Sequence, residues 1–133
     1  MKKVLFTLLI LFAVVTTYAQ WIQTDGPTGG FVRAFAGSDT NFFAGTSGGV
    51  FRSTNNGTSW KTVKPLTNTE IYSLALKDTN LFAGASKGII YLSTNNGTSW
   101  IPTVTNSNST ITSLAVIDTN IFAVTSGDCV FRS

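Results

Sequence analysis

The chain has 133 residues, among them nine lysines and arginines, six aspartates and glutamates, one cysteine and no histidine. Without histidine, the Ser-His-Asp triad, imidazole acid–base catalysis and histidine metal ligands are excluded. The single cysteine excludes an internal disulfide, and the formal net charge of +3 is too small for a strongly basic protein.

The first 19 residues have the pattern of a cleavable signal peptide. Lys2 and Lys3 precede an apolar stretch, Val4–Val15, which is shorter than the roughly 20 residues of a membrane-spanning helix. Small residues at Thr17 and Ala19 predict cleavage before Gln20, with an uncleaved anchor as the alternative. We therefore expect residues 20–133 to be secreted, periplasmic or displayed at the cell surface, without a stable membrane span.

Removal of this leader also lowers the charge. Lys2 and Lys3 leave with it, so that seven basic residues face six acidic ones and the net charge becomes +1. No cluster of lysines and arginines remains, and we expect no nucleic-acid partner.

Cys129 aligns with Ile89 in the repeat described next, which predicts a small buried hydrophobic residue. An intermolecular disulfide is the alternative.

The remaining chain repeats one unit of about 40 residues. The octapeptide Ser-Thr-Asn-Asn-Gly-Thr-Ser-Trp occurs at Ser53–Trp60 and again at Ser93–Trp100. Such a period indicates a stack of identical supersecondary units. The equivalent positions are Trp21, Trp60 and Trp100; Val32, Ile71 and Ile111; Asp39, Asp78 and Asp118; Phe43, Phe82 and Phe122; and Ser53, Ser93 and Ser133.

Each unit is predicted to contain four short strands, because helical periodicity is absent and turn residues recur. Asp-Thr-Asn triplets and two-residue Gly-containing turns mark tight connections between them. In chain order the predicted strands are Trp21–Thr24, Val32–Ser38, Asn41–Ser47, Val50–Asn55, Trp60–Val63, Ile71–Lys77, Asn80–Ser86, Ile89–Asn95, Trp100–Val104, Ile111–Ile117, Asn120–Ser126 and Cys129–Ser133.

The strand sequences predict an all-β fold made of β-propeller blades. The run Leu81–Ala85 is apolar on both faces, and a sheet with two apolar faces is covered on both sides. Four-stranded antiparallel sheets of about 40 residues, stacked face to face, are propeller blades. We expect about three such sheets, in an incomplete propeller. Small residues at Ala44, Gly45, Ala83 and Gly84 suit a crowded region near the central axis.

The octapeptide resembles the Asp-box, or BNR repeat, with the pattern Ser-x-Asp-x-Gly-x-Thr-Trp. The whole unit is similar to secreted bacterial propellers with photosystem-assembly-factor-like and sortilin-type repeats. Asn55 and Asn95 stand where the pattern has Asp, and their side-chain oxygens can still accept backbone N–H bonds. We interpret ten residues as structural staples of the hairpin: Ser53, Asn55, Gly57, Ser59, Trp60, Ser93, Asn95, Gly97, Ser99 and Trp100.

The octapeptide is not predicted to be a catalytic, cofactor or metal site. A Ca²⁺ loop is the functional alternative, since side-chain oxygens alternate through Ser53, Asn55 and Ser59, but the box contains no carboxylate. Trp60 and Trp100 are predicted to pack between neighbouring blades, and Trp21, as an equivalent residue, to be buried as well. We expect no cofactor.

Binding is the function that the sequence favours over catalysis. Asp39, Asp78 and Asp118 occupy one structural position, which suits turn residues better than a catalytic pair with two different roles. Loops Asp25–Gly30, Lys64–Glu70 and Thr105–Thr110 are polar and suit a protein or glycan ligand, or are simple solvated connections. We therefore expect a secreted, non-enzymatic scaffold.

The alternative is a fragment of an Asp-box glycoside hydrolase, either sialidase-like or xyloglucanase-like. The resemblance implies that a sialidase needs an arginine cluster, a nucleophilic Tyr with a Glu partner, and an acid–base Asp. The arginines here are only Arg33, Arg52 and Arg132, and two of them are repeat equivalents.

Three units are fewer than the four to eight blades of a closed propeller. Either the protein continues beyond Ser133, or two or more copies assemble into one ring, with six blades from a dimer. Because Ser133 lies at the start of a third octapeptide, the sequence favours the first explanation. Homo-oligomerisation is the expectation if the chain is complete.

Overall fold

The structure is a computed structural model that describes residues 21–38, 41–127 and 129–133, so the predicted leader lies outside the described residues. Every regular element in this part of the chain is a β-strand. The strands are β1 (Val32–Ser38), β2 (Asn41–Thr46), β3 (Gly49–Ser53), β4 (Lys61–Thr62), β5 (Ile71–Lys77), β6 (Asn80–Ala85), β7 (Ile89–Ser93), β8 (Ile101–Val104), β9 (Ile111–Ile117), β10 (Asn120–Thr125) and β11 (Val130–Arg132).

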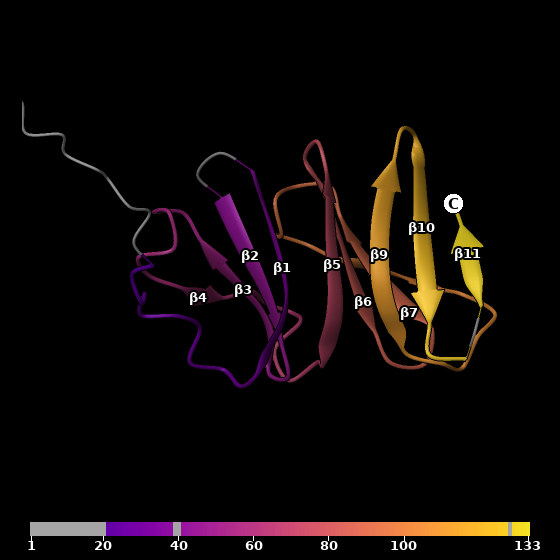
Figure 1. The fold of residues 1–133 in the computed structure, drawn as a ribbon, viewed down its shortest axis with the longest axis horizontal. Coiled ribbons are helices and arrows are strands. Elements are labelled where there is room, and N and C mark those ends of the chain that lie inside the picture. The colour runs from indigo at the N-terminus through magenta and orange to yellow at the C-terminus, as the bar shows by residue number, and fades with distance from the viewer. Residues whose placement is uncertain (1–20, 39–40, 128) are drawn as a thin grey trace, which may run out of the picture.

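The strands form three antiparallel sheets that stand side by side like blades (Figure 1). The first sheet has the order β1-β2-β3-β4 and the second has the order β5-β6-β7-β8. The third contains β9, β10 and β11 among the described residues. The predicted all-β class and blade-like sheets are confirmed, and β1, β5 and β9 have the predicted bounds.

Turn residues explain where the strands end. Asp78 and Asp118 have φ angles of 54° and 52° in the turns before β6 and β10. Asp tolerates this left-handed conformation because its short side chain can bond nearby backbone. Asp39, the third member of the set, lies outside the described residues. Lys87 and Gly88 also have positive φ, at 57° and 67°, in the hairpin between β6 and β7.

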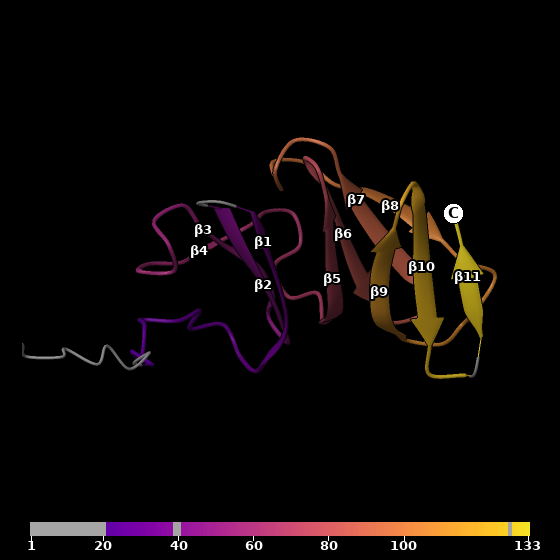
Figure 2. The same ribbon diagram turned by 45° about the horizontal axis from the view of Figure 1, so that its top comes forward.

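Neighbouring sheets pack through their first strands, with β5 between β1 and β9 (Figure 2). Gly45 and Gly84, on the second strands, allow this close approach. A Cβ atom at Gly45 would lie 2.6 Å from Cγ2 of Ile71, and one at Gly84 would lie 2.6 Å from Cγ2 of Ile111. These glycines, predicted to lie in a crowded region near the central axis, are crowded by the neighbouring sheet.

The hydrophobic core fills the space between the first and second sheets. Its buried members come from both sheets, from the loop that joins them and, in the case of Trp100, from the position just before β8: Phe43, Val50, Val63, Leu66, Ile71, Leu74, Leu81, Ala83, Ala85 and Trp100. The sides of the first and third sheets that face away from the second carry exposed apolar residues. Phe35 in β1 is 59% exposed and Ile117 in β9 is 56% exposed.

The three equivalent tryptophans lie in three different environments. Trp100 is 9% exposed and belongs to the core between the first two sheets, as predicted. Trp60 is half-buried, and its ring lies 6.1 Å from that of Phe35. The predictions for Trp21 and for a strand at Trp21–Thr24 are wrong, because Trp21 is fully exposed and the segment forms no strand. An isolated strand has no partner for its backbone hydrogen bonds.

The predicted burial of Cys129 is also wrong, since this residue is exposed. Its repeat equivalent Ile89 is partly covered, because β8 pairs with β7 and places Val104 opposite Ile89. The third sheet has no such fourth strand among the described residues. The difference in burial therefore comes from the open edge of β11.

Candidate functional site

The two octapeptides form the same hydrogen-bond network. In the first, Ser53 Oγ accepts the Gly57 N–H at 2.9 Å and donates to Asn55 Oδ1 at 2.9 Å. Asn55 Oδ1 also accepts the Ser59 N–H at 2.9 Å. The Trp60 indole N–H donates to the Gly57 carbonyl at 3.1 Å. Bonds of the same kind, at nearly the same distances, join Ser93, Asn95, Gly97, Ser99 and Trp100.

These networks use the oxygens of the box inside the hairpin itself. Both Oδ1 atoms point to donors of their own loop, which is the arrangement expected of a structural staple. Gly57 and Gly97 have φ angles of 82° and 81°, a conformation that glycine adopts without the steric cost of a Cβ atom. Asn56 and Asn96 also have positive φ, so they belong to the turn as well, although the octapeptide pattern did not predict this.

Ser93→Ala is expected to destabilise the protein by about 1–3 kcal/mol, because the buried Gly97 N–H loses its acceptor. Ser93 is 1% exposed, so water cannot replace the hydroxyl. Urea unfolding followed by circular dichroism measures the change. Thr94→Ala, at an exposed neighbouring position, is the matched control. A loss equal to that of the control would show that the staple does not stabilise the hairpin.

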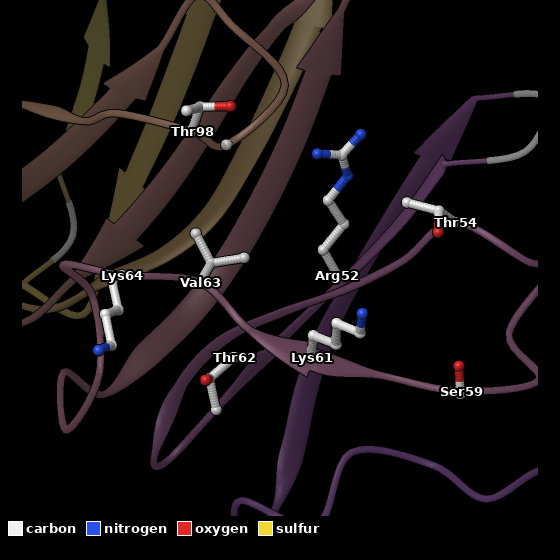
Figure 3. Close-up of a pocket in the computed structure, with 9 residues that line it drawn as sticks. Arg52, Thr54, Ser59, Lys61, Thr62, Val63, Lys64 and Thr98 are labelled. Atoms are coloured by element: carbon white, nitrogen blue, oxygen red, sulfur yellow. The ribbon is translucent and has the colours of Figure 1, made fainter.

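A groove with a volume of about 460 Å³ lies between the first two sheets (Figure 3). We call it the interblade groove. It extends from the end of the first octapeptide to the tip of the second. Its lining residues are Arg52, Thr54, Ser59, Lys61, Thr62, Val63, Lys64, Gly97 and Thr98.

Three cationic side chains and several hydroxyl groups give the interblade groove its character. Arg52, Lys61 and Lys64 line it, and its lining includes no Asp or Glu. Arg52 is fixed from two sides, because its Nη2 donates to Asn41 Oδ1 at 2.8 Å and its guanidinium lies 5.8 Å from the centre of the Phe43 ring. Its Nε atom is buried and has no acceptor within the described residues. The groove therefore favours an anionic ligand group that accepts hydrogen bonds.

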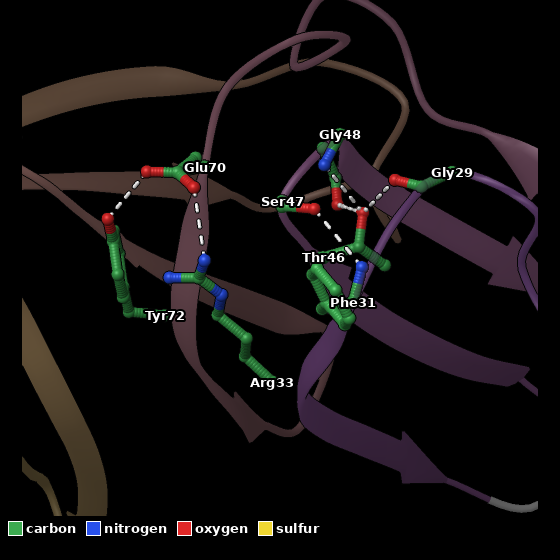
Figure 4. A network of polar contacts seen from close by, with 9 residues as sticks. Gly29, Phe31, Arg33, Thr46, Ser47, Gly48, Glu70 and Tyr72 are labelled. Atoms are coloured by element: carbon green, nitrogen blue, oxygen red, sulfur yellow. Dashed lines mark hydrogen bonds and ion pairs between the residues drawn. The ribbon is translucent and has the colours of Figure 1, made fainter.

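A second polar cluster joins β1 to β5 (Figure 4). Arg33 Nη2 lies 3.1 Å from Glu70 Oε1, and the Tyr72 hydroxyl donates to Glu70 Oε2 at 2.6 Å. The Arg33 guanidinium also lies 4.5 Å from the centre of the Tyr72 ring. Sequence reasoning missed this cluster, because Arg33 and Glu70 are 37 residues apart and no motif connects them.

The predicted binding loops contribute little to the interblade groove. Of Lys64–Glu70, only Lys64 lines it, while Leu66 is buried and the Asn68 N–H donates to the Gly48 carbonyl at 2.8 Å. The Ser109 carbonyl likewise accepts the Gly88 N–H at 2.7 Å. Loop Lys64–Glu70 is thus hydrogen-bonded to the β2–β3 hairpin, and loop Thr105–Thr110 to the β6–β7 hairpin. The sequence contained one indication of the groove, the positive charges of Arg52, Lys61 and Lys64. The repeat pattern did not show that these three residues lie around one cavity.

Two further observations concern metals and membranes. Within the described residues, no group of three or more His, Cys, Asp or Glu side chains is placed to hold a metal ion. In the same part of the chain, no helix has the length and apolar character needed to cross a membrane.

The comparison with known proteins identifies the fold. No protein-family model and no curated protein sequence matches the chain. Among solved structures, an ancestral GH74 enzyme matches 81% of this chain with a TM-score of 0.70 and 23% identity. The structure of YCF48 bound to D1 peptide matches 81% of the chain with a TM-score of 0.67 and 14% identity. The computationally designed protein Ika8 matches 76% with a TM-score of 0.63 and 16% identity.

The matched region is a minor part of each of these structures. The alignments cover 18% of the GH74 chain, 39% of the YCF48 chain and 32% of the Ika8 chain. At such low identity the likeness concerns the fold alone. Together with the three stacked antiparallel sheets, it shows that the described residues have a β-propeller-like fold.

Proposed function

We propose that the protein is a secreted, non-enzymatic binding scaffold whose protein or glycan ligand presents a carboxylate or sulfate to the interblade groove. The observation that carries the proposal is the placement of Arg52, Lys61 and Lys64 around one cavity without a carboxylate in its lining.

Rigid surroundings support binding at this groove. Arg52 is held by Asn41 and by the Phe43 ring, so little side-chain entropy is lost when a ligand arrives. Lys61 and Lys64 are exposed and add charge at the rim. Ser59, Thr54 and Thr98 offer hydroxyl groups that suit a sugar or an extended peptide. The YCF48 structure was solved with a peptide, a ligand of the class proposed here.

Acidic ligands are expected to bind the protein with an affinity that falls as salt rises. Screening on arrays of acidic peptides and of uronate- or sulfate-bearing glycans identifies the class. Lys61→Ala and Lys64→Ala are each expected to weaken the best ligand about threefold to fivefold, since an exposed charge contact contributes roughly 1 kcal/mol. Lys87→Asn, outside the groove at positive φ, removes the same charge as a control.

Equal losses for all three variants would mean that net charge, rather than this groove, attracts the ligand. No binding to any acidic ligand would remove the proposal. Both results are read from titration calorimetry of the full chain at two salt concentrations.

Glycoside hydrolysis is the second candidate, and the Tyr72–Glu70 contact favours it. A tyrosine hydroxyl 2.6 Å from a carboxylate, beside an arginine, has the elements of an activated nucleophile and a carboxylate-binding group. This reading predicts that the protein hydrolyses an aryl glycoside, sialosides included, and that Tyr72→Phe abolishes turnover. If the protein hydrolyses no aryl glycoside, this candidate is removed and the binding proposal is left intact. Hydrolysis that Tyr72→Phe leaves unchanged would show that Tyr72 is not the nucleophile, and would also contradict the non-enzymatic part of the binding proposal.

A further inference from the structure

The outermost strand of the first sheet, β4, has an edge that no strand of the described residues covers. β4 pairs with β3 on one side, where Lys61 aligns with Arg52. The Val63 N–H donates to the Val50 carbonyl at 2.8 Å, so the backbone groups of Val63 face β3. Because this direction alternates along a strand, the N–H and C=O of Thr62 point away from β3. Thr62 is exposed, and no backbone hydrogen bond of the described residues uses either group.

An outer edge of this kind belongs to the architecture of each sheet. The first strands β1, β5 and β9 pack side by side, and the strand order runs from them to β4 in the first sheet and to β8 in the second. The second sheet, which has a neighbour on both sides in the described part of the chain, therefore also ends on an outer strand. What distinguishes β4 from β8 is its sequence.

The repeat shows that the residues along β4 are not required by the fold. Pro102 in β8 is the equivalent of Thr62, and a proline has no N–H to offer another chain at a sheet edge. The second sheet has an apolar residue wherever the first has a cation of the interblade groove: Leu92 for Arg52, Ile101 for Lys61 and Val104 for Lys64. Of these two sheets, only the first combines an open edge with positive charge.

The interblade groove runs along this open edge (Figure 3). Four consecutive residues, 61 to 64, line it. Consecutive side chains of a strand point to opposite faces, so a groove that contacts all four follows the backbone of the segment. Gly97 and Thr98, from the second octapeptide, also line the groove. Its shape therefore suits an extended chain that lies alongside β4.

The positive charges lie on one face of the sheet at this edge. Lys61 and Arg52 are opposite each other on neighbouring strands, so their side chains share a face. Val63, two residues after Lys61, has its side chain on the same face, in the core against the second sheet. A strand added beside β4 would present alternate side chains to Lys61, and the backbone groups of the residues between them to Thr62.

We propose that the outer edge of β4 binds an extended peptide as an added antiparallel strand, with a Glu or Asp side chain opposite Lys61. This inference rests on the proposed function and narrows its ligand to a peptide. The Thr62 N–H and C=O exchange two hydrogen bonds with one peptide residue, and the acidic neighbours are selected by Lys61, Lys64 and Arg52. A glycan has no alternating N–H and C=O groups with which to extend the sheet.

N-methylation of the peptide backbone tests the added strand. The probe is an acetylated and amidated heptapeptide of alternating Thr and Glu, with Thr at both ends. Its glutamates align with Lys61, so their N–H groups point to solvent, whereas the N–H groups of its threonines point to β4. N-methylation of the threonines is expected to weaken binding at least about tenfold, and N-methylation of the glutamates less than about threefold. Titration calorimetry with the full chain measures both losses.

The repeat also supplies a matching change in the protein. Thr62→Pro removes the outward N–H, and Pro102 aligns with Tyr91 in the intact pairing of β7 with β8, so the sheet accepts proline at this position. Thr62→Ala keeps the N–H. We expect Thr62→Pro to weaken the heptapeptide about tenfold more than Thr62→Ala does. Circular dichroism checks that both variants are folded, and the N-methylated peptides test the unchanged protein in either case.

The possible failures separate this inference from the proposed function. Equal losses for the two N-methylated peptides would overturn the added strand, and the reverse pattern would overturn its register. Binding of uronate- or sulfate-bearing glycans without binding of the heptapeptide would also overturn the strand. In each of these cases the anion-binding groove stands. If neither the heptapeptide nor any acidic glycan binds, the inference and the proposed function fail together.

Discussion

Phe43→Ala is expected to destabilise the protein by about 3–5 kcal/mol, the loss typical of a large aromatic side chain removed from a packed core. Phe43 is 0% exposed and belongs to the core between the first two sheets. Its ring contacts the tip of the second octapeptide, where a Cβ atom at Gly97 would lie 3.0 Å from Cε1. It also lies under the guanidinium of Arg52.

The loss is measured by urea unfolding followed by circular dichroism, with Phe31→Ala as the control. Phe31 is 81% exposed, so its truncation is expected to cost less than about 0.5 kcal/mol. Phe43→Ala should also weaken anion binding at the interblade groove, because Arg52 loses the ring beside it. A change below about 1 kcal/mol would show that the two sheets do not depend on this contact.

Gly84→Val is expected to destabilise the protein by at least about 1–3 kcal/mol, through overpacking where the second sheet meets the third. A Cβ atom at Gly84 would lie 2.3 Å from Ser73 Oγ and 2.6 Å from Cγ2 of Ile111. Ser73 is buried and its hydroxyl donates to the Ile111 carbonyl at 3.0 Å, so the hydroxyl cannot move away without breaking this bond. Ile111 is 0% exposed, so its side chain is packed on all sides.

The same repeat position in the third sheet supplies the control. Val124 is partly exposed, and Val124→Ala is expected to change the unfolding free energy by less than about 1 kcal/mol. Both variants are compared by thermal unfolding at one protein concentration. Equal effects at the two positions would show that the sheets can separate to admit a side chain at Gly84.

Most of the local structure follows from residue patterns within one repeat. Alternating branched and small residues predicted β1, β5 and β9 with their observed bounds. Asp78 and Asp118 predicted the turns, where their φ angles are positive. Ser53, Asn55 and Gly57 bond one another within one loop. These features depend on contacts between residues close in sequence, which is why a single repeat was enough to find them.

The candidate site could be predicted only in part. Arg52, Lys61 and Lys64 lie on a strand, a neighbouring strand and the loop that follows, and pairing of β3 with β4 brings the first two together. Gly97 and Thr98 reach the groove from the next repeat. Arg33 and Glu70 meet for the same reason, across two sheets. Nothing local in the sequence sets the spacing of one sheet from the next.

By itself, the sequence determined the repeat, the strand class, the turns and the octapeptide loops, because each depends on nearby residues. Only the tertiary structure decided how residues at equivalent positions of the repeat differ in burial. Trp100 is buried, Trp60 is half-buried and Trp21 is exposed, although the repeat aligns all three. The physical reason is that burial depends on the sheet alongside. In the described part of the chain, the second sheet has a neighbour on both sides, whereas the first and third each have a neighbour on one side.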